Sequence, residues 1–284
     1  MRWQGRRKSG NVEDRRGISG RGLAIGGGLG SIVIVALVLL LGGNPDDVIQ
    51  SLQTEETTPG STTSEPLSEK DKEMGDFVSV VLADIEDTWQ PIFQEIGQDY
   101  RAPHLVLFTD QVSSACGYAG SATGPFYCPG DEKVYLDLSF FEEMQNKLGA
   151  PGDFALAYVI AHEVGHHVQK LLGINDQVMA QRERLDEQDS NQLMVRMELQ
   201  ADFLAGVWAH YAQQAQDFLE RGDIEEGLNA ASAVGDDRIQ RQTQGYVVPD
   251  AFTHGTSEQR VRWFKKGLET GDIRQGDTFG ARAL

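Results

Sequence analysis

Two histidines and a glutamate have the spacing of a catalytic zinc site. They are His162, Glu163 and His166, within an apolar run that covers residues 154–172. Side chains four residues apart on a helix share a face, with Cβ atoms about 5–6 Å apart, so the two histidines could bind one Zn²⁺. Glu163 would lie beside them as general base toward a water at the metal. A buried helix with two core histidines is the alternative interpretation.

A catalytic zinc site also needs a third protein ligand and an open position for water. Metzincins have a third histidine six residues after the second, but that position holds Leu172 here. The helical pattern of residues 191–220 instead offers Glu198 and Asp202, four residues apart on one face. We assign Glu198 to the metal and Asp202 to the second ring nitrogen of a ligand histidine. Spacing alone would also allow the reverse assignment, or an ordinary salt-bridged pair on the helix surface.

Other residues complete the expected site. The oxyanion formed during peptide hydrolysis needs a hydrogen-bond donor, and we assign this role to His254, with Tyr246 behind it. The alternative for His254 is a loop histidine that caps the helix starting near residue 256. His167 lies about 140° around the motif helix from the first histidine, which indicates packing or support. The strand expected at residues 133–138 would pair with an extended substrate.

Six segments of the sequence together resemble the neutral zinc metallopeptidase family of bacteria. They are residues 124–129, 134–141, 162–169, 198–202, 235–240 and 254–260. The spacing of the paired histidines and the later carboxylates is also similar to the gluzincin arrangement of thermolysin-like peptidases. The resemblance covers about residues 75–275 and the N-terminal anchor, and it implies a zinc-dependent peptidase domain on a membrane. The family often has a cysteine where this chain has Phe203, so any bond made there is absent.

The charge of the chain limits its partners. The 284 residues have a formal net charge of −18, yet residues 1–21 carry seven Lys or Arg and only two acidic residues. The rest of the chain therefore has a net charge of −23. Phosphate backbones repel a body this acidic, so we expect no nucleic-acid partner.

Composition divides the chain into four segments. Residues 1–21 are basic and lack hydrophobic periodicity, which predicts a disordered tail. Residues 22–43 carry no charge, and as a helix they would span about 33 Å, enough to cross a bilayer. The basic flank predicts a cytoplasmic N-terminus and an extracytoplasmic body; a cleavable signal peptide is the alternative. Residues 44–74 are rich in Thr, Ser, Glu and Pro and predict a disordered linker, followed by the peptidase domain at 75–284.

The domain is expected to be α+β and mainly helical, with a small antiparallel sheet before the motif helix. We expect strands at 104–109, 116–118 and 133–138, and helices at 77–96, 153–172, 191–220, 222–240 and 256–270. Pro91 would kink or split the first helix. Asp153 is the expected N-cap of the motif helix, and Gly165 within it indicates the close approach of another element.

Cys116 and Cys128 are the only two cysteines of the chain. In an exported domain they can form a disulfide that closes a loop of about a dozen residues. Two free thiols or a zinc pair are the alternatives.

These observations predict a zinc-dependent endopeptidase that binds one Zn²⁺ and hydrolyses peptide or protein substrates outside the cytoplasm. Its N-terminal helix would hold it in the membrane as a single-pass protein. The alternative is a catalytically silent, membrane-anchored zinc protein that serves as a binding or assembly factor. The presence of Glu163 disfavours this alternative, because a structural zinc site needs no general base.

Overall fold

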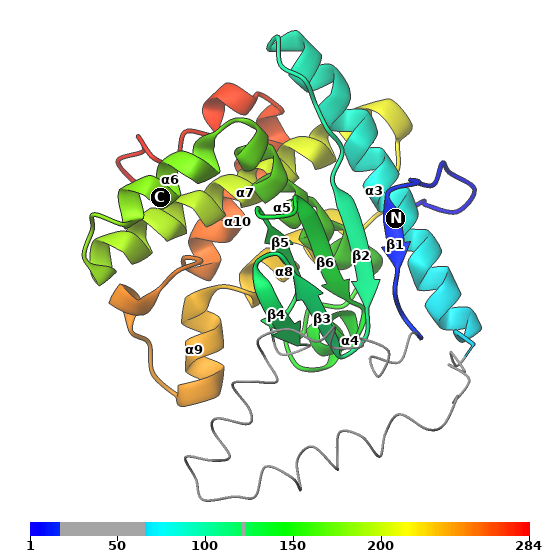
Figure 1. Ribbon diagram of the computed structural model, residues 1–284, viewed down its shortest axis with the longest axis horizontal. Helices are drawn as coiled ribbons and strands as arrows, with labels where there is room; N and C mark the ends of the chain where they lie inside the picture. The colour runs from blue at the N-terminus through cyan, green and yellow to red at the C-terminus, as the bar shows by residue number, and fades with distance from the viewer. Residues whose placement is uncertain (18–65, 121–122) are drawn as a thin grey trace, which may run out of the picture. The chain divides into compact units, whose positions relative to one another are not determined.

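The computed structural model describes residues 1–17, 66–120 and 123–284 (Figure 1). The chain divides into two compact units. The first joins Met1–Arg15 to Ser68–Leu284 and contains every element discussed below. The second, Arg16–Leu67, consists almost entirely of residues outside the described ranges.

The beginning of the chain belongs to the folded domain. Strand β1 (Val12–Asp14) pairs in parallel with strand β2 (His104–Phe108), so the prediction of a disordered tail is wrong for this segment. Strands of one sheet must lie on the same side of any membrane. The pairing therefore places residues 12–14 on the same side as the domain, and which side of a membrane this is stays a prediction.

The predicted membrane span at residues 22–43 and most of the predicted linker lie outside the described residues. Within the described ranges, no helix is both long and apolar enough to cross a bilayer.

Helix α3 (Glu69–Glu95) holds the N-terminal segment through ion pairs. The guanidinium of Arg6 lies 2.6 Å from the carboxylate of Asp84, and that of Arg7 lies 2.8 Å from Asp87. The helix begins earlier than the predicted linker ends, because Ser68 forms a capping box with the third helical residue. Pro91 lies inside this helix, which continues for four more residues.

The main sheet is mixed, with the order β1-β2-β6-β5. Strand β6 (Lys133–Asp137) runs parallel to β2, and β5 (Phe126–Cys128) runs antiparallel to β6. The prediction of an antiparallel sheet is wrong for the first three strands. The long connection from β2 to β6 brings the chain back in the same direction, as a parallel pair requires.

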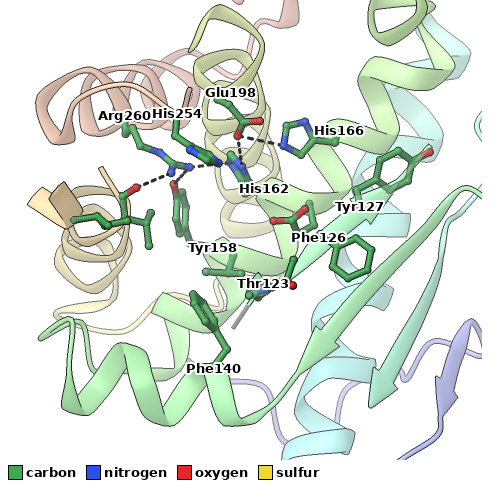
Figure 2. A pocket seen from close by; sticks show the side chains of 16 residues that line it. Thr123, Phe126, Tyr127, Phe140, Tyr158, His162, His166, Glu198, His254 and Arg260 are labelled. Carbon is green, nitrogen blue, oxygen red and sulfur yellow. Dashed lines mark hydrogen bonds and ion pairs between the residues drawn. The ribbon is translucent and has the colours of Figure 1, made fainter. Parts of the chain in front are cut away.

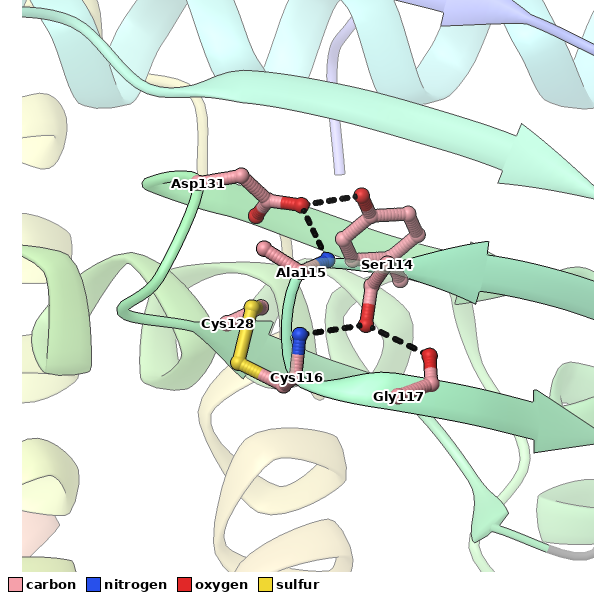
Figure 3. Close-up of a disulfide and its surroundings, with 7 residues drawn as sticks. Ser114, Ala115, Cys116, Gly117, Cys128 and Asp131 are labelled. Carbon is pink, nitrogen blue, oxygen red and sulfur yellow. Dashed lines mark hydrogen bonds between the residues drawn. A yellow bond between two sulfur atoms is a disulfide. The ribbon is translucent and has the colours of Figure 1, made fainter. Parts of the chain in front are cut away.

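The second sheet is a hairpin of β3 (Gln111–Ser114) and β4 (Gly117–Gly120), close to the strand expected at 116–118. A disulfide between Cys116 and Cys128 ties this hairpin to β5, with the two Cα atoms 5.8 Å apart (Figure 3). The predicted disulfide is thus present in the structure.

Seven further α-helices follow among the described residues. They are α4 (Ser139–Asn146), α5 (Asp153–Leu171), α6 (Ile174–Arg182), α7 (Glu187–Gln216), α8 (Asp223–Ala233), α9 (Asp236–Gln244) and α10 (Ser257–Thr270), with short 3₁₀ turns at Pro249–Ala251 and Ile273–Gln275. The helix expected at 222–240 is interrupted at Gly235. A Cβ atom there would lie 2.4 Å from the backbone nitrogen of Ser257. The N-cap of α5 is Gly152, and Asp153 is its first residue.

Helix α5 is the centre of the domain. Most of its residues are buried, because the sheet strands β5 and β6 pack on it together with α3, α7 and α8. One face of the sheet, with Leu105 and Leu136, joins this main core. The other face, with Val106 and Tyr135, forms a smaller cluster with the hairpin. The helix that carries the motif is thus held rigidly from several sides.

Candidate metal centre

The structure brings His162, His166 and Glu198 together (Figure 2). One carboxylate oxygen of Glu198, Oε2, lies 3.2 Å from His162 Nε2 and 3.4 Å from His166 Nε2. The two imidazoles come from α5 and the carboxylate comes from α7. The residues that the sequence proposed as ligands therefore converge on one point.

These distances fit a tetrahedral Zn²⁺ site. Two ligand atoms about 2.05 Å from an ion at the tetrahedral angle lie about 3.3 Å apart. The carboxylate oxygen of Glu198 stands at about this distance from both imidazole nitrogens. Two imidazoles and one carboxylate also form a common ligand set of catalytic zinc, so the residues present fit the metal.

Close packing of α5 on α7 makes this convergence possible. A Cβ atom at Gly165 would lie 3.0 Å from the backbone oxygen of Ala201 and 3.1 Å from its Cα. Any larger side chain at Gly165 would push the helices apart and withdraw Glu198 from the histidines. The close approach expected at this glycine is confirmed.

Electrostatics favour a cation among these atoms. Burial disfavours the charged form of His162, but the Asp202 and Glu198 carboxylates outweigh it and raise the pKa of His162 to about 9. Burial also opposes charge on Glu198, yet the two imidazoles hold the pKa of that carboxyl well below its usual range. A divalent metal would compete with the imidazole protons for this place.

A buried charged network supports His162. The Nδ1 atom of His162 lies 2.8 Å from Asp202 Oδ1, so Asp202 stands where its predicted supporting role requires. Arg260 on α10 donates two hydrogen bonds of 2.9 Å to the same carboxylate, and Tyr158 donates one of 2.5 Å. Asp202 is completely buried, and the Arg260 guanidinium beside it holds the pKa of its carboxyl low despite that burial.

Sequence reasoning assigned no role to Tyr158 or Arg260, although both carried a signal. Tyr158 lies four residues before His162 and therefore on the same helix face. Arg260 shares the buried face of α10 with Trp263 and Phe264, where an arginine needs a buried partner.

A cavity of about 370 Å³ opens in front of the ligand triad. Glu163, 8% exposed, lines it together with His162, His166 and Glu198. Its apolar walls include Phe126, Phe140, Val159, Val234 and Ile239. The candidate general base and the candidate ligands thus share one solvent-accessible space.

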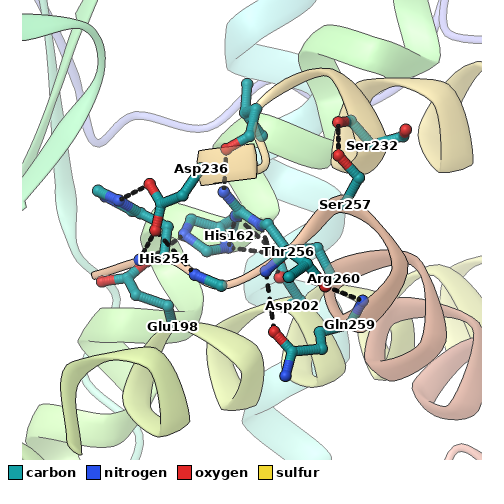
Figure 4. Close-up of polar contacts among 12 residues, drawn as sticks. His162, Glu198, Asp202, Ser232, Asp236, His254, Thr256, Ser257, Gln259 and Arg260 are labelled. Atoms are coloured by element: carbon teal, nitrogen blue, oxygen red, sulfur yellow. Dashed lines mark hydrogen bonds and ion pairs between the residues drawn. The ribbon is translucent and has the colours of Figure 1, made fainter. Parts of the chain in front are cut away.

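His254 also lines this cavity, and a carboxylate fixes its loop (Figure 4). Asp236 accepts hydrogen bonds from the backbone nitrogens of Thr253, His254 and Gly255, and lies 3.3 Å from His254 Nδ1. Desolvation opposes the charged form, but the hydrogen bond to Asp236 raises the pKa of His254. The helix that follows is capped by Thr256, so His254 is not its cap.

Two other expectations have different outcomes. Tyr246 is 63% exposed and is not among the residues that line the cavity, so its place behind His254 stays a prediction. His167 points away from the triad: its Nδ1 lies 3.0 Å from the Tyr127 hydroxyl and its Nε2 lies 2.6 Å from the backbone oxygen of Arg101. His167 therefore packs α5 against the sheet side of the domain.

Comparisons with known proteins give relatives and a family for the chain. The chain is 51% identical over 287 residues to "Uncharacterized protein YpfJ" of Escherichia coli strain K12, and the match covers 99% of each chain. It is 41% identical over 261 residues to "Uncharacterized protein Rv2575" of Mycobacterium tuberculosis, covering 87% of this chain and 86% of the relative. No solved structure matches. A family model described as "Putative neutral zinc metallopeptidase" matches residues 1–279, and the chain belongs to this family.

Proposed function

We propose that the protein is a zinc-dependent peptidase whose metal is held by His162, His166 and Glu198. The observation that carries the proposal is the position of the Glu198 carboxylate, 3.2 and 3.4 Å from two imidazole nitrogens, at the wall of a cavity that Glu163 also lines. Family membership supports zinc-peptidase chemistry at the general level.

Bound Zn²⁺ would lower the pKa of a water molecule to about 7 and polarise the scissile carbonyl. Glu163 would accept the proton of that water and pass it to the leaving amine. Glu163 stands next to His162 on α5 and lines the same cavity, which would bring it within reach of that water.

The structure changes the expected mode of substrate binding. Strand β6 has a neighbour on each side, so the prediction that it pairs with the substrate is wrong. Strand β5 is the edge of the sheet on the cavity side, and its Phe126 and Tyr127 line the cavity. We propose that an extended peptide adds to the edge of β5, which places its backbone across the front of the ligand triad.

His254 would donate a hydrogen bond to the oxyanion that develops on the carbonyl oxygen. Asp236 holds the histidine loop by three backbone hydrogen bonds, so the donor is preorganised. Arg260 also lines the cavity, but its guanidinium is bound to Asp202. Its role is to support His162.

The location of the domain is a separate part of the proposal. A disulfide between Cys116 and Cys128 is typical of an oxidising compartment, so we propose that the domain lies outside the cytoplasm. The apolar segment 22–43 would contact the membrane. Because residues 1–15 belong to the same unit, they would lie on the same side as the domain.

Maleimide labelling of intact cells tests this location. Gln4→Cys and Lys265→Cys introduce thiols at exposed positions, one in the N-terminal segment and one on α10, while both native cysteines are bonded. We expect a membrane-impermeant maleimide to label both variants. Labelling of Lys265→Cys alone would contradict the packing of the N-terminal segment on the domain, and labelling of neither would place the domain inside.

Digestion of a peptide library tests the activity. Glu163→Gln should lower the cleavage rate at least about 100-fold while bound zinc stays near one ion per chain. The matched control is Glu258→Gln, an exposed glutamate on α10, which should change neither quantity. Unchanged cleavage by Glu163→Gln would contradict its role. Absence of any zinc-dependent cleavage by the wild type would favour the catalytically silent zinc protein.

A further inference from the structure

The two histidines of the centre are backed by different chemical groups. Behind His162 stands a carboxylate, which can only accept a hydrogen bond when ionised. Behind His166 stands an amide: its Nδ1 lies 2.9 Å from Oε1 of Gln169, one turn further along α5. An amide could either donate or accept, so the orientation of Gln169 decides which ring nitrogen of His166 carries a proton.

The partners of Gln169 determine that orientation. Its nitrogen, Nε2, lies 2.8 Å from the backbone oxygen of Met197 and 3.0 Å from Oε1 of Gln200. A backbone oxygen cannot donate, so the Gln169 nitrogen must face Met197. Both hydrogens of the amide are then used, and the Gln169 oxygen is left to face His166. The reverse orientation would place that oxygen against two other oxygens inside a fully buried site.

Gln200 is oriented by the same reasoning. Its Nε2 lies 2.9 Å from the backbone oxygen of Gly276, which can only accept. The oxygen of Gln200 therefore faces Gln169 and accepts from it. The two amides therefore form a chain of hydrogen bonds, which we call the amide relay. The backbone oxygen of Gly276 fixes the orientation of Gln200, and the backbone oxygen of Met197 fixes that of Gln169.

The C-terminal segment that carries Gly276 is itself fixed on α7. A Cβ atom at Gly276 would lie 2.6 Å from the ring of Phe203, so this backbone is packed directly against the helix. Two residues later, Thr278 donates a hydrogen bond of 2.6 Å to the backbone oxygen of Arg196. The carbonyl that orients the relay thus has a defined position relative to Glu198.

We propose that Gln169 and Gln200 are positioning residues that hold His166 in the Nδ1-protonated tautomer. Its Nε2 then presents a lone pair toward the metal. The carboxylate of Asp202 produces the same tautomer in His162. The amide relay does so without adding another negative charge beside Glu198 and Asp202. This inference rests on the metal centre of the proposed function.

The tautomer can be read directly by nuclear magnetic resonance. Two-bond proton–nitrogen correlation spectra of ¹⁵N-histidine-labelled, metal-free protein, at a pH where the ring is neutral, distinguish protonated from unprotonated ring nitrogens. We expect His166 to be protonated at Nδ1 in the wild type. A wild-type His166 protonated mainly at Nε2 would overturn the proposal, even if no variant could be purified.

Two variants locate the effect in the relay. Gln169→Leu removes the acceptor, so we expect loss of the single tautomer and a zinc affinity about 10–100-fold weaker. Gln200→Leu should also weaken the tautomer preference and the zinc affinity, but by less than Gln169→Leu does. The reason is that Gln169 keeps its hydrogen bond to the backbone oxygen of Met197. Gln192→Leu, on the exposed face of α7, is the control and should leave both quantities unchanged. A Gln169→Leu protein with wild-type tautomer and wild-type zinc affinity would contradict the proposal.

The two proposals fail in different ways. The tautomer is measured without metal and without substrate. An Nδ1-protonated His166 in a protein that binds zinc but cleaves nothing would refute the peptidase and leave the relay standing. Cleavage that depends on Glu163, with His166 in the other tautomer, would do the reverse.

Discussion

Among the described residues, two clusters of three side chains could each hold a metal ion. They differ in the cation that balances their negative charge. One contains His162, His166 and Glu198; the other contains Asp153, Asp223 and Glu226. In each cluster the ligand atoms lie within 4.8 Å of one another. Geometry alone therefore does not separate a metal centre from a group of acids.

In the acidic cluster, the balancing cation is the ammonium group of Met1. The ammonium group of Met1 lies 2.8 Å from Asp153 and 3.3 Å from Asp223, and the side chain of Met1 is buried. In the histidine cluster, the nearby guanidinium of Arg260 is bound to Asp202 and does not replace a metal ligand. The acidic cluster thus anchors the N-terminal segment, whereas the histidine cluster offers nitrogen ligands to a metal.

The largest expected difference between the clusters is in bound zinc. Glu198→Ala removes one of the three proposed ligands, so this variant should lose its zinc. Glu226→Gln changes the acidic cluster and should keep about one ion per chain. Native mass spectrometry of both variants gives the stoichiometry. If Glu226→Gln lost zinc and Glu198→Ala kept it, the two clusters would have to exchange roles.

The next largest effect concerns the charge behind His162. Asp202→Ala leaves Arg260 buried without its carboxylate, so the free energy of unfolding should fall by about 3–5 kcal/mol. Urea denaturation measures this change. The double variant Asp202→Ala/Arg260→Met should recover part of the loss, because no unpaired charge remains. A loss below about 1 kcal/mol in the single variant would show that the network contributes little to stability.

The N-terminal segment should show a characteristic pH dependence. Burial raises the pKa of Asp84, the partner of Arg6, to about 6. The folded protein then binds a proton that the unfolded chain has already released. The contribution of Asp84 to the free energy of unfolding should therefore fall by about 3 kcal/mol in total as the pH rises from about 3 to about 7.

Denaturation of the wild type and of Asp84→Asn at several pH values isolates that contribution. The stability of the wild type relative to the variant should decline across this pH window. A constant difference between the two proteins would mean that Asp84 titrates normally in the folded state.

The smallest effect is expected at the acidic cluster. Asp223→Asn weakens one contact of the Met1 ammonium, so the free energy of unfolding should fall by about 2 kcal/mol at neutral pH. Although burial opposes the charge, the hydrogen bond to Asp153 and the nearby carboxylates raise the pKa of the Met1 amine above its usual value. Its contribution is therefore present below about pH 8 and is lost as the pH rises through the raised pKa. Thermal melts at pH 7 and pH 10 should show a larger difference at pH 7.

Much of the candidate metal centre could be predicted because its signals are local. His162 and His166 share a helix face by spacing alone, and Glu198 with Asp202 repeats that spacing on a second helix. Spacing could not assign the two carboxylates. The packing of Gly165 on Ala201 brings the two helices together. In this arrangement Glu198 lies beside the Nε2 atom of His162, and Asp202 lies beside its Nδ1 atom.

The N-terminal segment and the sheet could not be predicted in the same way. Strand β1 has three residues and a polar sequence, so it shows no periodicity, and its partner lies about 90 residues away. The arginines before it suggested a solvated tail, because their carboxylate partners on α3 are equally distant in sequence. Parallel pairing of β2 with β6 depends on the path of the intervening chain, which composition does not reveal.

X-ray absorption at the zinc edge tests the central claim most directly, because it reads the ligands of the metal in the protein as purified. We predict four nitrogen or oxygen ligands at about 2.0–2.1 Å, two of them imidazoles, and the loss of this signal in Glu198→Ala. A spectrum with three or more imidazoles, or one that Glu198→Ala leaves unchanged, would contradict the assignment of His162, His166 and Glu198 as the zinc ligands.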